Sequence, residues 1–234
     1  SATRLPGKPL LKINNLSIIS HVVNKAKKTD IGRVIVCTED QSIIEDVKKN
    51  GGEAVLTGNQ HNSGTDRIFE AYKKLDIRDV DYVLNIQGDE PAINEKDIIN
   101  LYNKMIETDS NIGTLGAKID DKKIFVNENI VKVRTKERLD KKNFSLALSF
   151  KRKHIFKEEE NVYHHIGVYA YQIKALEKFI NLSQTKNEIQ NRLEQLRAID
   201  NGLKINVTLA ETSSLGVDTE EDYLALKKIM EYKS

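Results

Sequence analysis

Hydrophobic and polar positions alternate between strand-like and helix-like patterns through the first half of the chain. Short apolar runs typical of buried strands occur at Arg33–Cys37, Glu53–Leu56 and Tyr82–Ile86. Between them, apolar residues recur at helical spacing in Gln41–Asn50 and in the stretch for which Ser63 is the predicted N-cap. This β-α-β-α order predicts a parallel sheet with helices on both faces.

After a predicted helix over Asn94–Ile106, the pattern changes at about residue 110. Three segments then read as strands with little helix between them: Ile112–Ala117, Ile130–Arg134 and Ser145–Phe150. We interpret these strands as a mixed-sheet extension. The chain is therefore predicted to be α/β, with a mostly parallel Rossmann-like sheet and this extension in a single domain over residues 1–234.

Towards the carboxyl end, strands and helices alternate again. Val168–Tyr171 and Lys204–Leu209 are predicted strands, and Ala175–Ile180 and Glu188–Ile199 are predicted helices. Thr219 is the predicted cap of a last helix, because an acid follows it three residues later.

Charge and composition exclude several classes of protein. The chain has 234 residues with 37 Lys and Arg against 35 Asp and Glu, so it lacks the basic excess of a dedicated nucleic-acid binder. No apolar run approaches the length of a membrane span. Cys37 is the only cysteine, which excludes an intrachain disulfide and fits a cytoplasmic protein.

The loop at Ser1–Leu10 carries the first candidate chemistry. Gly7 allows close approach of the backbone to a ligand, and two prolines restrict the loop around it. Arg4 and Lys8 bring a planar fork and a point charge, which suit the oxygens of a polyphosphate. The spacing is not that of a Walker loop. From the loop alone, an ordinary basic turn is an equal alternative.

Two acids lie at positions where an α/β protein binds ligands. Asp89 follows the predicted strand at Tyr82–Ile86, and Asp218 precedes the last predicted helix. Mg²⁺ usually takes one or two carboxylates together with phosphate oxygens and water. A magnesium site beside the polyphosphate loop is therefore plausible chemistry for this pair of aspartates.

Several segments, in order over nearly the whole chain, resemble the 3-deoxy-manno-octulosonate (Kdo) cytidylyltransferases, or CMP-Kdo synthetases. The segments are Ser1–Leu10, His61–Arg67, Asn85–Pro91, Val131–Val133, His165–Tyr169, Leu193–Arg197 and Gly216–Thr219. The resemblance implies a nucleotidyltransferase that activates Kdo with CTP, giving CMP-Kdo and pyrophosphate for lipopolysaccharide biosynthesis. It also implies a cytoplasmic homodimer with a dimerisation lobe roughly within 112–170, and partners that include neither nucleic acid nor membrane.

The same resemblance assigns roles to single residues. It gives Arg4, Gly7 and Lys8 to the nucleotide. It makes Lys8, Asp89 and Asp218 catalytic, with the two aspartates as ligands of Mg²⁺. The residues that it places around the sugar acid are Arg67, Gln87, Arg152, His165, Tyr169, Glu194 and Gln195.

Two features depart from the family pattern. Lys151 replaces a serine, and Lys153–Phe156 replaces a proline-containing segment, which leaves room for 8-amino-Kdo or a sialic acid as the substrate. The Leu5–Lys8 loop is shared with CMP-sialate synthetases and does not discriminate between these acids. The apolar strand that precedes this loop in the family is absent, so we expect the sequence to begin late. A non-catalytic nucleotide-binding relative is the remaining alternative, and the two candidate metal ligands argue against it.

Overall fold

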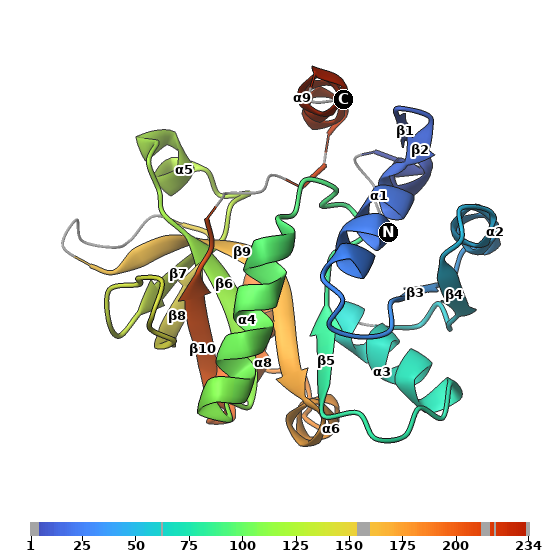
Figure 1. The fold of residues 1–234 in the computed structure, drawn as a ribbon. Helices are drawn as coiled ribbons and strands as arrows, with labels where there is room; N and C mark the ends of the chain where they lie inside the picture. The colour runs from blue at the N-terminus through green and yellow to red at the C-terminus, as the bar shows by residue number, and fades with distance from the viewer. Residues whose placement is uncertain (1–4, 62, 154–159, 212–215, 218, 233–234) are drawn as a thin grey trace. The chain divides into compact units, whose positions relative to one another are not determined.

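The computed structural model describes residues 5–61, 63–153, 160–211, 216–217 and 219–232 (Figure 1). The chain divides into two compact units, each of which is described by itself. Unit 1 comprises residues 1–76, 86–96 and 214–234, and unit 2 comprises residues 77–85 and 97–213. The single domain over 1–234 and the dimerisation lobe within 112–170 stay predictions.

Unit 1 contains a short parallel sheet and several helices. Its elements are η1 (Lys8–Leu10), β1 (Lys12–Ile13), β2 (Leu16–Ser17), α1 (Ile18–Lys28), β3 (Ile35–Thr38), α2 (Gln41–Lys49), β4 (Glu53–Leu56), α3 (Gly64–Lys74) and α9 (Glu220–Tyr232). β3 and β4 pair in parallel, and β1 pairs antiparallel with β2. The apolar sides of α1 and α2 meet at Val23 and Val47 and cover residues of both parallel strands. The alternation predicted for this region is confirmed.

Two helices of unit 1 begin at the residues that the sequence indicates. The Ser63 hydroxyl accepts a hydrogen bond from the Asp66 amide at 3.2 Å at the start of α3. At the start of α9, the Asp222 amide donates to the Thr219 hydroxyl at 3.1 Å, and the Thr219 amide donates to the Asp222 carboxylate at 2.9 Å. Both predicted caps are confirmed, since each supplies an acceptor for an amide that lacks a partner within its helix.

Unit 2 is built on a six-stranded mixed sheet in the order β5-β9-β6-β10-β8-β7. The strands are β5 (Tyr82–Asn85), β6 (Ile112–Ala117), β7 (Lys132–Thr135), β8 (Ser145–Lys151), β9 (Val162–Gln172) and β10 (Ile205–Leu209). β9 runs antiparallel to β5, β6 and β7, whereas β10 is parallel to β6 and antiparallel to β8. The predicted mixed extension is confirmed. Antiparallel pairs outnumber parallel ones in the described part of the chain because the long β9 runs against three neighbours.

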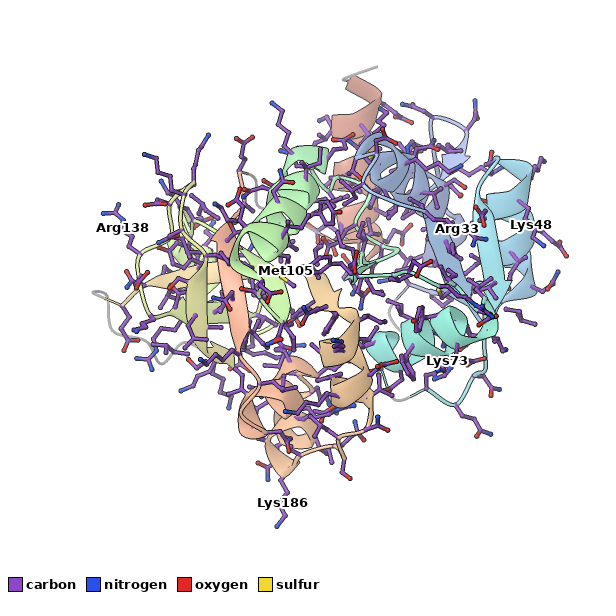
Figure 2. All side chains as sticks on the ribbon, turned by 60° about the horizontal axis from the view of Figure 1, so that its bottom comes forward. Arg33, Lys48, Lys73, Met105, Arg138 and Lys186 are labelled. Atoms are coloured by element: carbon purple, nitrogen blue, oxygen red, sulfur yellow. The ribbon has the colours of Figure 1, made fainter. Side chains whose placement is uncertain are left out.

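Helix α4 (Glu95–Thr108) lies across one face of this sheet (Figure 1). Its approach to β6 depends on Gly113, where a Cβ atom would lie 2.6 Å from the sulfur of Met105 and 2.7 Å from the ring of Phe144. Met105 is fully buried, whereas the labelled side chains of Arg138 and Lys186 project outward from unit 2 (Figure 2).

One predicted helix is wrong. In place of a continuous helix over Glu188–Ile199, the chain forms α7 (Lys186–Asn191) and α8 (Gln195–Asp200). Arg192 takes a left-handed backbone conformation with φ 52°, which ends α7 as a glycine usually does.

Two further helices of unit 2 are α5 (Lys122–Val126), which the pattern did not predict, and α6 (Ile173–Ile180). Within the part of the chain that the structure describes, every helix is too short or too polar to cross a bilayer.

Candidate active site

The predicted nucleotide loop and the predicted metal ligand meet in unit 1. Gly7 has a left-handed backbone with φ 69° and precedes the short helix η1, in which Lys8 is the first residue. The Lys8 ammonium donates to the Asp89 carboxylate and, at 2.9 Å, to the carbonyl oxygen of Val217. Asp89 lies in the turn after β5, and its own carbonyl accepts the Val217 amide at 3.0 Å. Three segments that are distant in the sequence are therefore joined at one point.

The atoms around the Lys8 ammonium fit a hard divalent cation. The ammonium is held by a carboxylate oxygen of Asp89 and a carbonyl oxygen of Val217, and both are oxygen donors of the kind that Mg²⁺ uses. Among the described residues, no group of three or more His, Cys, Asp or Glu side chains that could hold a metal ion gathers at this point or at any other. Arg4 and Asp218 lie outside the described residues, so the proposed second ligand follows Val217 directly but has no described position.

Arg67 and Gln87, which are predicted to contact the sugar acid, also belong to unit 1. The Arg67 guanidinium donates to the Thr57 hydroxyl at 2.7 Å and to the Gly58 carbonyl at 3.0 Å, and it forms an ion pair with Glu39. The main-chain carbonyl of Gln87 accepts the Glu90 amide at 3.3 Å in the turn that contains Asp89. Their roles towards a substrate stay predictions.

His165 and Tyr169 form an aromatic cluster in unit 2. Both lie on β9, and their ring centres are 5.4 Å apart, with the Phe150 ring packed edge-on against His165 at 5.0 Å. The Thr114 hydroxyl lies 3.0 Å from the His165 ring nitrogen. Burial, with His164 and Arg152 nearby, lowers the pKa of His165 to about 3, so its imidazole is neutral at pH 7.

The Tyr169 hydroxyl is a sign of a polar ligand in this cluster. It is buried and has no hydrogen-bond partner of normal geometry among the described residues. Burial raises the pKa of Tyr169 well above its usual value, the nearby Tyr171 and Glu194 act in the same direction, and the Thr114 hydroxyl acts against them. A buried hydroxyl without a partner costs free energy, which a bound polar molecule would recover.

The remaining predicted sugar-acid residues of unit 2 lie at the start of α8 and after β8. Glu194 is the N-cap of α8, and Gln195 is its buried first residue. Arg152 follows β8 directly and donates to the Asn129 carbonyl at 3.1 Å. Arg152 contributes to the lowered pKa of His165, and Glu194 contributes to the raised pKa of Tyr169. The departure at His154–Phe156 lies outside the described residues.

Two supporting features were missed in the sequence. Glu188 and Arg197 form a buried two-point ion pair at 2.9 and 2.6 Å, which joins α7 to α8 beside the Glu194–Gln195 pair. Lys132 is fully buried in β7. The signal for Lys132 was present in Val131–Val133, because a lysine between two valines in a strand otherwise read as apolar requires an explanation.

Comparisons with known proteins show the family of this chain. A family model described as cytidylyltransferase matches residues 1–205. Two proteins named 3-deoxy-manno-octulosonate cytidylyltransferase match 98% of the chain. The one from Thermodesulfovibrio yellowstonii is 40% identical with 94% of its length covered, and the one from Afipia carboxidovorans is 41% identical with 93% covered.

A solved structure gives the same result. The structure of CMP:2-keto-3-deoxy-manno-octonic acid synthetase complexed with CTP is 30% identical and has a TM-score of 0.89, over 100% of this chain and 95% of that one. This likeness confirms the predicted α/β nucleotidyltransferase fold. The chain is thus a nucleotidyltransferase and belongs to the 3-deoxy-manno-octulosonate cytidylyltransferase family.

Proposed function

We propose that this chain transfers the cytidylyl group of CTP to Kdo, giving CMP-Kdo and pyrophosphate for lipopolysaccharide biosynthesis. The observation that carries this proposal is the contact of Lys8, from the nucleotide loop, with Asp89, in a chain that is similar over 98% of its length to enzymes of this name. The anomeric hydroxyl of the acid attacks the α-phosphorus of CTP. A new P–O bond forms there as the bond to the pyrophosphate oxygen breaks, and the hydroxyl proton is released to water.

The residues of unit 1 serve the nucleotide in this proposal. Lys8 and Arg4 hold the triphosphate and neutralise the charge that grows on the leaving pyrophosphate. Asp89 and Asp218 are the proposed ligands of Mg²⁺, which when bound supplies Lewis-acid polarisation of the phosphate oxygens. Gly7 leaves the backbone of the loop open to the phosphates, because no atom of the described residues, its chain neighbours aside, lies within 4 Å of the place where a side chain would begin.

The residues of unit 2 serve the sugar acid. Because His165 is neutral at pH 7, we assign it to hydrogen bonding rather than to charge pairing. Arg152 is then the cation of this cluster that meets the carboxylate of the acid. The buried Tyr169 hydroxyl, together with Glu194 and Gln195, offers donors and acceptors to sugar hydroxyls, and Arg67 and Gln87 are the proposed contacts from unit 1.

The location and assembly of the enzyme belong to the same proposal. We expect a cytoplasmic homodimer in which residues 112–170 supply the dimer contact. The single cysteine, Cys37, fits a reducing compartment.

The test is pyrophosphate release from CTP and Mg²⁺ with Kdo, 8-amino-Kdo or sialic acid offered separately. Release with Kdo alone supports the proposal. Release only with another acid supports the same reaction with that acid as the substrate. If CTP binds in the presence of Mg²⁺ but no acid leads to pyrophosphate release, the result contradicts catalysis and supports a nucleotide-binding relative.

A further inference from the structure

Lys132 is a fully buried lysine whose ammonium is held by main-chain carbonyl groups. It is 0% exposed in β7 and donates to the carbonyls of Asn127 at 2.8 Å and Ile130 at 2.9 Å, and to that of Arg152. An ammonium has three N–H donors, so these three acceptors use all of them. Burying a cation against neutral groups is costly, and full hydrogen bonding offsets that cost only when all three carbonyls are in place.

The three carbonyls come from two segments that Lys132 joins. Asn127 and Ile130 bound a turn that also contains Asn129, and Arg152 is the residue directly after β8. The Arg152 guanidinium donates back to the Asn129 carbonyl at 3.1 Å. Two side chains, those of Lys132 and Arg152, therefore donate hydrogen bonds to main-chain carbonyls of the turn.

On its other side, the same strand holds His165. Lys132 pairs with His164 in the β7–β9 ladder, and the His165 amide donates to the Val131 carbonyl at 2.9 Å. β7 thus fixes the backbone of His165 through the ladder and the backbone of Arg152 through the lysine side chain. These are two of the residues that the proposed function assigns to the sugar acid.

We propose that Lys132 is a positioning residue of the sugar-acid site. Its ammonium ties the backbone of Arg152 to β7, and thereby sets where the Arg152 guanidinium meets the carboxylate of the substrate. This inference rests on the proposed function. If Lys132 were merely structural, its replacement would lower the stability of the protein without raising the KM for the sugar acid relative to the KM for CTP. A positioning residue of the sugar-acid site affects the first KM alone, because the nucleotide residues belong to unit 1.

The decisive variant is Lys132→Met, which keeps an unbranched side chain that is one atom shorter and removes all three donors. We expect kcat/KM for the sugar acid to fall about 10- to 100-fold through a higher KM, with the KM for CTP unchanged, because Arg152 is displaced. The matched control is Met105→Ala, which opens a cavity in the core of unit 2 under α4. The control loses stability but keeps both KM values.

A milder variant covers the case in which Lys132→Met does not fold. The Asn127 side chain is exposed, and its oxygen accepts the Asn129 amide at 2.9 Å, so Asn127→Ala loosens the same turn from outside. We expect a smaller rise in the KM for the sugar acid and none in that for CTP. Equal changes in both KM values, or a loss of stability alone as in Met105→Ala, would overturn the proposal.

A second readout separates this inference from the proposed function. Hydrogen–deuterium exchange reports on the amides of Asn129 and Ile130, which are hydrogen-bonded to the side chain and the main-chain carbonyl of Asn127 within the turn. Faster exchange there in Lys132→Met, but not in Met105→Ala, supports the lysine tie even if the wild-type protein activates none of the acids. If the wild-type protein activates none of the acids, only the proposed function is refuted. If exchange is unchanged in Lys132→Met, the lysine tie is refuted.

Discussion

At the scale of single residues, the Lys8–Asp89 contact places a cation against the carboxylate that is proposed to bind Mg²⁺. The ammonium donates hydrogen bonds to one carboxylate oxygen of Asp89 and to the Val217 carbonyl oxygen. These oxygen atoms would also suit another cation at this position. A triphosphate offers Lys8 stronger partners than a single carboxylate does. Binding of CTP would therefore draw the ammonium away and leave Asp89 available.

Changing Asp89→Asn tests this assignment. The amide keeps the shape of the side chain and removes its charge, so we expect turnover to fall about 100-fold or more while the fold stays intact. The measurement is pyrophosphate release together with thermal unfolding. Glu90→Gln is the matched control, since it neutralises the adjacent acid; near-normal turnover in Asp89→Asn would remove the metal assignment.

The buried His165 makes a prediction about pH. Its pKa is about 3 in the folded protein against an ordinary 6.5, so below pH 6.5 the unfolded chain binds a proton that the folded chain does not. The free energy of unfolding therefore falls as the pH is lowered from 6.5 towards 3, by up to about 1.4 kcal/mol per pH unit from this group.

Urea unfolding at pH 7.5 and pH 5 measures this effect. We expect the wild-type protein to lose about 2 kcal/mol more than His165→Gln over this interval, because the variant has no group to protonate there. The same loss in both proteins would show that His165 is not the group responsible.

At the scale of elements, the close packing of α4 on β6 depends on a glycine. A methyl group at Gly113 would overlap with the sulfur of Met105 and the ring of Phe144, and would lie 2.9 Å from Leu101. We expect Gly113→Ala to lower the free energy of unfolding by about 1–3 kcal/mol through overpacking. The control is Gly32→Ala, because in the part of the chain that the structure describes only its chain neighbours lie within 4 Å of the added methyl group. Equal stability of the two variants in chemical denaturation would contradict this account.

At the scale of the whole molecule, much of the element order could be predicted from the sequence. Glu53–Leu56 and Ile112–Ala117 form strands with the predicted bounds, since each is a short apolar run of strand length. The break at Arg192 could not be predicted, because a left-handed arginine has no local signal of the kind that glycine provides.

The candidate site was predictable to a similar degree. Lys8 and Asp89 lie in motif segments, and the structure joins them. Lys132 was missed because its burial depends on carbonyls from two other segments, and no pattern within β7 encodes their arrival.

The proposed dimer is also a property of the whole molecule. Light scattering at micromolar concentration is expected to give twice the chain mass of 26.6 kDa. Leu148 is 41% exposed on β8, within the proposed lobe, so Leu148→Lys is expected to raise the monomer fraction. Leu56→Lys changes a leucine that is 48% exposed in unit 1 and is expected to leave the dimer intact. A monomeric wild-type protein would refute the dimer.

The strand order of unit 2 has a consequence for synthesis on the ribosome. Within the sheet, β6 is bonded on one side to β9 and on the other to β10, and both are translated long after it. The nascent chain must therefore carry β6, an entirely buried strand, without either neighbour until β9 has emerged near residue 172, and without β10 until residues near 209 have emerged. Unpaired apolar strands of this kind are sites of aggregation. Slower or hotter synthesis should consequently reduce the yield of folded enzyme before it reduces the stability of molecules already folded.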